Sequence, residues 1–447
     1  MGSKFANDLH RRLALLFCLC FCMINVAMGG ETTVPGTPTA NGAATVAGAP
    51  LSAMTAMNAS PMPFVASTLV ISEFRLRGPN GANDEFIEIY NTSSSPHTVV
   101  ASPSGAGYGV AASDGILRCT IPNGTVIPGH GHFLCVNSVG YNYASYPAGN
   151  GTTATGDASY TTDIPDNVGI ALFTSDLPAN FTLANRLDAV GPANEANTLF
   201  KEGTGYGTLT PFSINSAWVR DTCGKQGNNA TFGPCASGGV PIDTDNNVTD
   251  FYFVDTNGTS AGGGQRLGAP GPKNLSSPVI TSTIAAAPID STQPITGPPN
   301  RLRDMTSNAA NNSTFGTLEI RRRFINTTGI PVTRLRFRII DITTFPAISV
   351  NADLRPIFSP DIGVAGINDA STCGINPTPC AITLRGTTLE VGGGGQPNGG
   401  GWNSSLSANS ITLGTPLAPG NSINVRFVMG VQQKGNFRFI VSIEALP

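Results

Sequence analysis

The chain has 447 residues, and its composition already excludes several classes of protein. Charged residues make up only 12%, against roughly 25% in an average soluble protein, and the net charge of −3 argues against a long acidic or basic tail. Glycine (53) and proline (34) are abundant, which disfavours helical bundles and coiled coils. Because 40% of the residues are hydrophobic, we expect a folded all-β protein rather than a disordered chain.

The N-terminus has the pattern of a signal peptide. Basic residues precede an apolar run of 16 residues, Leu13–Met28, and the small residues Ala27 and Gly29 then mark a cleavage site. A membrane span usually needs about 20 apolar residues, so retention as an anchor is the less favoured alternative. We therefore expect a signal peptide over residues 1–29, no stable membrane span after its cleavage, and a secreted or cell-surface protein.

Six cysteines lie beyond this segment, and they fall into three close pairs. Six thiols allow 15 connectivities, of which local pairing is the simplest because each bond would close one loop or hairpin. Metal ligation is the alternative, but no pair has the Cys-x-x-Cys spacing. Disulfides indicate an oxidising compartment. The expected bonds are Cys119–Cys135, Cys223–Cys235 and Cys373–Cys380.

The rest of the chain divides by composition and charge. We expect a low-complexity spacer over 30–66, a β domain over 67–275, a Pro-rich linker over 276–300 and a second β domain over 301–447. The first β domain carries 17 acidic and 9 basic residues, a net charge of −8, whereas the second carries 8 acidic and 13 basic residues, a net charge of +5. These opposite charges would either dock the domains together or serve separate partners.

The first β domain contains motifs that resemble the lamin tail domain. An Ile-Ser-Glu strand at 71–73 is followed by a loop and then by Glu-Phe-Ile-Glu-Ile-Tyr-Asn at 85–91, which resembles the opening of that family. Three later segments resemble its subsequent turn and strands, in order: Ile127–Leu134, Val168–Leu172 and Leu187–Gly191. The resemblance covers about 67–275. It implies an immunoglobulin-like (Ig-like) β-sandwich of the bacterial secreted type that mediates contacts, without a common active site in the family.

Two small groups in this domain invite a catalytic or metal-binding interpretation. Glu73 and Glu88 could form the carboxylate pair of a glycoside hydrolase. We favour a structural role, in which Glu88 hydrogen-bonds backbone to fix the sheet, because a buried carboxylate needs partners. His130 and His132 would point to the same side of a strand, but two histidines without a third ligand are a weak metal site. No catalytic residue is assigned.

The strongest ligand pattern is the acidic loop Asp243–Asp250. Oxygen side chains at alternate positions suit calcium, which takes six to eight oxygen ligands. Val248 stands where an EF-hand loop needs glycine, so an EF-hand is rejected. A calcium site is one interpretation, but we favour a cluster of Asx turns, in which Asp and Asn side chains bond the local backbone. The candidate metal ligands are Asp243, Asp245, Asn247 and Asp250, with calcium the one cofactor suggested.

The second β domain begins with two alternating segments around the turn 326–329. Leu318–Ile325 and Val332–Ile342 predict a strand, a hairpin and a strand, and the strands at 425–429 and 437–441 repeat this form. The turn weakly resembles bacterial cell-surface Ig-like modules, which implies a second Ig-like sandwich. The alternation predicts that three arginines lie on the solvent face of the second strand. They would either bind a polyanion or prevent edge-to-edge pairing of sheets, and we favour the second role. These arginines are Arg334, Arg336 and Arg338.

The sequence therefore predicts two Ig-like β-sandwich domains joined by a Pro-rich linker. We expect an exported, non-catalytic interaction protein at or outside the cell envelope, with a protein or an envelope polymer as partner. The alternative is an accessory module that binds a polyanion or glycan beside a hydrolase. An enzyme is less favoured, and sequence-specific nucleic-acid binding is not expected because a net charge of +5 without interleaved aromatics is weak evidence for it.

Overall fold

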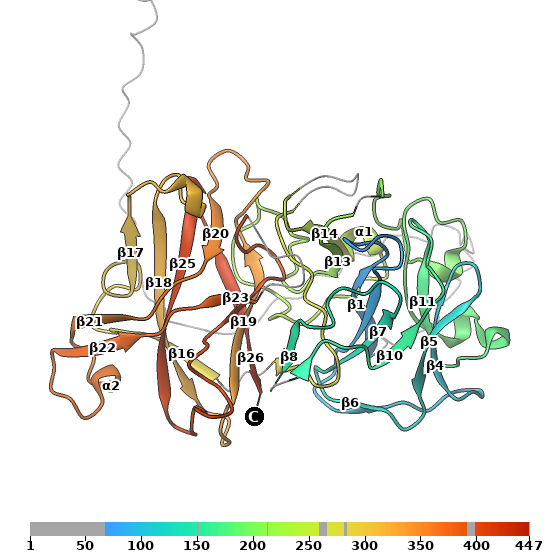
Figure 1. Cartoon of the computed structure of the whole chain (residues 1–447), viewed down its shortest axis with the longest axis horizontal. Helices are drawn as coiled ribbons and strands as arrows, with labels where there is room; N and C mark the ends of the chain where they lie inside the picture. Colours follow the sequence, from blue (N-terminus) through green and yellow to red (C-terminus); the bar gives the residue numbers. More distant parts are fainter. Residues whose placement is uncertain are drawn as a thin grey trace, which may run out of the picture. The chain divides into compact units, whose positions relative to one another are not determined.

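The computed structural model describes residues 68–149, 152–211, 213–258, 266–280, 284–390 and 398–446. The expected signal peptide (1–29) and spacer (30–66) lie outside the described residues. The structure confirms the all-β prediction, because short helical turns are the only other regular elements among the described residues. Figure 1 shows the strands in sequence colours.

Two sheets form the N-terminal half, which we define as β1 to β14. Their strand orders are β10-β7-β2-β1-β13-β14 and β12-β11-β4-β5. Two short ribbons, β3–β6 and β8–β9, accompany them. The strands are β1 Leu69–Arg75, β2 Phe86–Asn91, β3 His97–Thr98, β4 Gly107–Ala112, β5 Leu117–Pro122, β6 Val126–Ile127, β7 His132–Asn137, β8 Pro147–Gly149, β9 Thr152–Thr153, β10 Ala158–Tyr160, β11 Ile170–Phe173, β12 Arg186–Val190, β13 Ser216–Arg220 and β14 Phe251–Asp255. The helical turns are η1 Pro178–Asn180, η2 Leu183–Asn185, η3 Thr198–Phe200 and α1 Asn247–Asp250.

Strand β2 is buried on both faces, which explains its composition. Ile87 and Ile89 belong to the apolar core between the two N-terminal sheets. Their neighbour Phe86 belongs instead to the core that extends into the other half of the chain. Since successive side chains point to opposite faces, this alternation matches the sequence-based expectation. Every residue of β2 is nevertheless buried, so the second face is covered by protein.

Two further sheets and a ribbon form the C-terminal half, defined as β15 to β26. The orders are β15-β26-β19-β24-β23 and β16-β18-β25-β20, with β17 added on β18, and β21 pairs with β22. The strands are β15 Val279–Ile280, β16 Ile284–Pro288, β17 Arg301–Asp304, β18 Thr317–Asn326, β19 Arg334–Ile342, β20 Asp353–Ile357, β21 Ile362–Ile367, β22 Cys380–Leu384, β23 Thr388–Glu390, β24 Ser405–Ser407, β25 Ser422–Gln433 and β26 Phe439–Leu446. The helical turns are η4 Ala309–Asn311 and α2 Ala370–Cys373.

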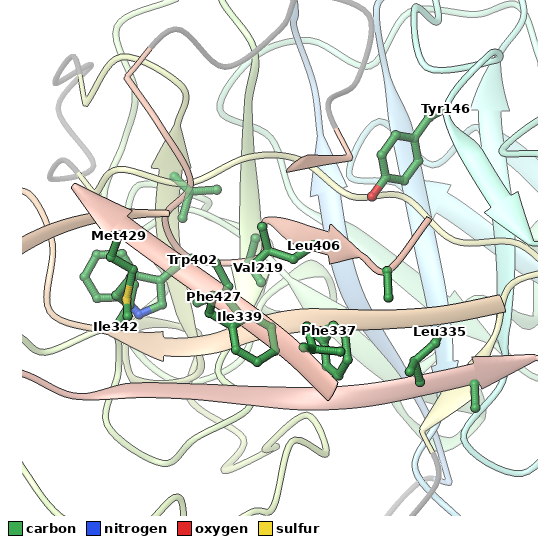
Figure 2. Packing of buried hydrophobic residues seen from close by; sticks show 14 of the residues in the cluster. Tyr146, Val219, Leu335, Phe337, Ile339, Ile342, Trp402, Leu406, Phe427 and Met429 are labelled. Atoms are coloured by element: carbon green, nitrogen blue, oxygen red, sulfur yellow. The ribbon is translucent and has the colours of Figure 1, made fainter. Parts of the chain in front are cut away.

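The two expected hairpins of this half are wrong. β18 pairs with β25 while β19 pairs with β26, so each pair of consecutive strands divides between the two sheets. The reason is the apolar face that both strands carry. Dividing them brings Phe337 of β19 to within 5.0 Å of Phe427 of β25, between ring centroids. Figure 2 shows this packing, together with Leu335 and Met429.

The Pro-rich segment 276–300 is not an open linker, contrary to expectation. β15 pairs with β26 and β16 pairs with β18, and the described residues of both halves belong to one compact unit. β16 stands at the edge of its sheet and ends at Pro288, a position where proline is tolerated because no ladder donor is lost. The prolines therefore limit these strands without abolishing them.

A close backbone crossing joins the halves after β14. Gly268 forms a bridge with Trp402, and the N–H of Trp402 donates to the carbonyl of Leu267 at 3.0 Å. A Cβ atom at Gly401 would lie 1.9 Å from that carbonyl oxygen, so only glycine permits this approach.

The structure contains the three disulfides expected from the cysteine spacing. Cys119 of β5 bonds to Cys135 of β7 and so connects the two N-terminal sheets. Cys223–Cys235 closes a loop after β13, and Cys373–Cys380 ties α2 to β22. Among the described residues, no helix has the length and apolar character needed to cross a membrane.

Candidate functional site

The arginine row of β19 is not a solvent-exposed face, which corrects the sequence-based expectation. Arg336 is fully buried and Arg338 is 6% exposed. Arg334 is partly exposed and pairs with Glu390. Apolar residues and arginines do alternate along β19, but the face opposite the apolar residues packs against the N-terminal half instead of facing water. Arg336, for example, donates to the carbonyl of Pro147 at 2.8 Å.

These arginines belong to a buried ionic network between the two halves, which we call the seam. Glu444 of β26 accepts from Arg336 at 3.0 Å and from Arg338 at 2.8 Å, and it also contacts the Lys273 ammonium. Although burial alone would raise it, the charges of Arg338, Lys273 and Arg336 hold the pKa of Glu444 well below its usual value. The seam comprises Glu73, Glu88, His132, Lys273, Arg336, Arg338, Glu390 and Glu444.

Glu73 and Glu88 meet in the seam as cross-strand partners. A β-bulge between Ile71 and Glu73 turns Glu73 to the same side as Glu88. Burial and the Glu88 charge raise the pKa of Glu73 to about 8. Glu88 accepts from the Ser72 hydroxyl at 2.6 Å and from the backbone N–H of Lys273 at 2.7 Å. With His132 and Lys273 nearby, its pKa is lowered in spite of burial.

This carboxylate pair has the split pKa values of an acid–base couple, but the space beside it is small. The adjoining cavity has a volume of about 40 Å³, enough for a few waters and far too small for a sugar ring. Glu88 bonds the backbone of a distant segment, as the structural interpretation expected. The geometry therefore favours a role in joining the halves over hydrolysis.

The two histidines of the His-x-His motif have different environments. His132 is buried, and its Nδ1 lies 3.2 Å from Glu88. His130 has a φ of 57° and its Nδ1 lies 3.2 Å from the Tyr90 hydroxyl. Neither belongs to any group of three or more His, Cys, Asp or Glu side chains close enough to share a metal ion within the described residues.

The acidic loop does not bring its four expected ligands together. Asn247 is fully buried and bonds the backbone N–H groups of Gly191 and Glu202, each at 3.0 Å. Asp250 accepts from the hydroxyl and backbone N–H of Thr244. Asp245 is exposed at a φ of 56°. The favoured expectation, a cluster of local Asx bonds, describes most of this loop.

Asp243 is the exception, because it faces the buried Arg220 at 3.0 Å. Arg220 also pairs with Asp188 of β12 at 2.6 Å and with Asp250 at 3.4 Å. The sequence does not indicate this role for Asp188, because 55 residues separate it from Asp243 and no local pattern marks it as a partner.

A groove in the C-terminal half adjoins three basic side chains. Its volume is about 320 Å³, and its floor is formed by apolar side chains such as Leu354 and Val431. Arg301 lies over the Phe437 ring at 5.7 Å, and Lys434 lies over the Phe315 ring at 5.0 Å. The full lining is Arg301, Arg303, Met305, Leu318, Ala352, Leu354, Val431, Lys434, Gly435 and Phe437.

The groove cations make no direct ion pair among the described residues. Across the described ranges, no carboxylate lies within 4.0 Å of the charged nitrogens of Arg301, Arg303 or Lys434. Arg303 instead donates to backbone carbonyls, including that of Thr317 at 2.9 Å. No sequence motif marks this group, because β17 and the turn before β26 lie about 130 residues apart. The alternating arginines of β17 were the one local signal.

Comparisons with known proteins identify no family. No protein-family model matches the chain, and no curated protein matches it. A crystal structure of a DUF4876 family protein from Bacteroides thetaiotaomicron is similar over 42% of this chain and 70% of that chain, with 18% identity and a TM-score of 0.25. A score this low carries no argument about function.

Proposed function

We propose that this chain is an exported, non-catalytic interaction protein that acts at or outside the cell envelope. Its N-terminal half is, in this proposal, a lamin-tail-like domain of the bacterial secreted type. The three disulfides support residence in an oxidising compartment. The observation that carries the binding role is the groove, where cations without carboxylate partners surround an apolar floor.

The chemistry of the groove selects an acidic polymer as the ligand. Arginine and lysine at the rim match phosphate, sulfate or carboxylate groups, and the guanidinium fork favours bidentate pairing. The apolar floor, with Met305 60% exposed, offers contact to the carbon face of a sugar or chain. A volume of about 320 Å³ holds one or two monomers, so a longer polymer would extend beyond it.

Binding to a labelled sulfated dextran tests this proposal, with neutral dextran as the ligand control. The double variant Arg301→Gln/Lys434→Gln is expected to weaken binding at least tenfold, because both rim charges are lost. The matched control is Arg323→Gln/Arg385→Gln, which removes two positive charges outside the groove. Neither residue is among those that line the groove: Arg323 lies further along β18 than the lining residue Leu318, and Arg385 pairs with exposed Asp361. Fluorescence polarisation at physiological salt measures both.

Equal weakening by the two double variants would mean that only net charge matters, and the groove assignment would be withdrawn. Lack of binding to sulfated dextran by the unaltered protein would also count against it.

Cell fractionation tests the proposed location at the envelope. The tagged protein should sediment with the envelope fraction and be released by high salt. Free protein in the culture medium would contradict envelope binding.

A further inference from the structure

Three carboxylates from separate segments of the N-terminal half converge beside Arg220. They are Asp188 on β12, Glu202 after η3, and Asp243 before α1. One ligand oxygen from each lies within 4.8 Å of those of the other two. This spacing suits a common cation, since calcium binds carboxylate oxygens at 2.3–2.6 Å.

Two of these carboxylates have an unused oxygen in the interior. Asp188 is fully buried, and its Oδ2 accepts from the N–H of Ile71 and from Arg220, both at 2.6 Å. Glu202 is 4% exposed, and its Oε1 accepts from Arg186 at 3.1 Å. The remaining oxygens, Asp188 Oδ1 and Glu202 Oε2, have no donor among the other described residues, and the two carboxyl groups lie within hydrogen-bond reach of each other. Burying unsatisfied carboxylate oxygens is costly, so these atoms call for a ligand.

The charge balance also favours a bound cation. The ion-paired acids Asp188, Glu202, Asp243 and Asp250 carry four formal negative charges, whereas Arg186 and Arg220 supply two positive charges. Asp245, whose pKa is raised by burial and by the charge of Asp243, adds to this negative excess, which favours a divalent cation. Asp243 is partly exposed, with 24% of its side chain accessible, so an ion can reach the cluster from solvent and keep water ligands on that side.

We propose that Asp188, Glu202 and Asp243 bind a calcium ion. The ligands are oxygens only, which suits a hard cation rather than zinc or copper. This set shares only Asp243 with the acidic loop that the sequence singled out. It ties β12 and the segment after η3 to the loop that precedes α1, and it is independent of the groove and its ligand.

A proton is the competing occupant. Burial, followed by the charges of Asp188 and Asp243, raises the pKa of Glu202 to about 10. A protonated Glu202 could donate to Asp188 and so satisfy both free oxygens without a metal. The experiment must therefore detect the ion itself.

Calorimetric titration of the chelator-treated full chain with calcium chloride provides that test. We expect one bound ion per chain, a rise in melting temperature with calcium, and affinity at least tenfold weaker in both Glu202→Gln and Asp243→Asn. Asp243→Asn guards against a folding defect in the buried variant, because its side chain is the accessible one. Asp245→Asn is the control, since this exposed loop residue lies outside the proposed ligand set.

Retained affinity in Asp245→Asn, with loss in the other two, supports the proposal. If Asp245→Asn abolishes binding and Glu202→Gln does not, the ion occupies the loop and the assignment is wrong. If neither calcium nor magnesium binds or stabilises the unaltered protein at millimolar concentration, Glu202 holds a proton and the proposal fails.

Discussion

Individual polar residues carry much of this fold, and their roles depend on contacts that the sequence does not show. Arg338 alternates with apolar residues as an exposed arginine would, yet it is buried against Glu444 and Asn403. Lys273 was unremarkable in the sequence, but its backbone and ammonium contact Glu88 and Glu444. Burial lowers the pKa of Lys273 to about 8, so its charge depends on these partners.

Asp157 should make stability depend on pH in a narrow window. Its Oδ2 accepts from the backbone N–H groups of Leu134 at 2.8 Å and Leu275 at 3.1 Å, and burial raises its pKa from 3.8 to about 6. The folded state therefore binds a proton that the unfolded state releases, so stability falls as the pH rises from about 4 to about 6. Asp157→Asn keeps the acceptor oxygen and should make this slope shallower, as measured by urea unfolding at several pH values; Asp188, whose pKa is also raised to about 6, keeps part of it.

The control for that measurement is Asp361→Asn. The N–H of Gly386 and the side chain of Arg385 lower the pKa of Asp361, so it titrates below the window. Its slope between about pH 4 and 6 should match that of the unaltered protein. Parallel profiles for Asp157→Asn and the unaltered protein would refute the role of Asp157.

At the scale of elements, strand positions were predictable and strand partners were not. The alternation in 334–342 located β19, because apolar side chains at every second position need one buried face. The same pattern fits a hairpin with β18 equally well. The choice of separate sheets follows from the contact of Phe324, Phe337 and Phe427, which only a sandwich brings together.

The disulfides should differ in their effect because they join different kinds of element. Cys119→Ala/Cys135→Ala removes the bond between the two N-terminal sheets and should lower the free energy of unfolding by about 3 kcal/mol, as loop-closure entropy predicts for a separation of 16 residues. Cys373→Ala/Cys380→Ala affects a satellite apolar cluster and should mainly speed hydrogen exchange in β21 and β22. Urea unfolding combined with hydrogen exchange distinguishes the two. Equal global destabilisation would contradict this distinction.

For the whole molecule, the seam is the decisive feature. It places Glu88, Glu390 and Glu444 against Lys273, Arg336 and Arg338, three formal charges of each sign. Glu73, with its raised pKa, can carry a proton near neutral pH. Among the described residues, the ion pairs that cross between the halves join Lys225 and Lys273 of the acidic N-terminal region to Asp341 and Glu444 of the basic C-terminal region, so the opposite net charges of the two regions do not explain the seam. These pairs are buried, where screening by salt is weak.

Removing the central acid of the seam should destabilise both halves together. Glu444→Gln leaves three buried cations without their shared counter-charge, and we expect a loss of about 3–5 kcal/mol in the free energy of unfolding at pH 7. Glu73→Gln resembles the protonated acid and should lose less than half as much. Urea unfolding, followed by the fluorescence of Trp218 and Trp402, reports on both halves. Similar losses in the two variants would show that the seam is not governed by Glu444.

The sequence alone determined the all-β class, the approximate strands and the pairing of nearby cysteines, because each depends on local periodicity, composition or short chain separation. Tertiary structure decided what the polar residues do. The partners of Arg336 and Arg338, the convergence of Asp188 with Asp243, and the placement of Arg301 and Lys434 in one groove all involve positions far apart in the chain. No local pattern encodes such encounters, since they arise only when sheets pack and buried charges find their counter-charges.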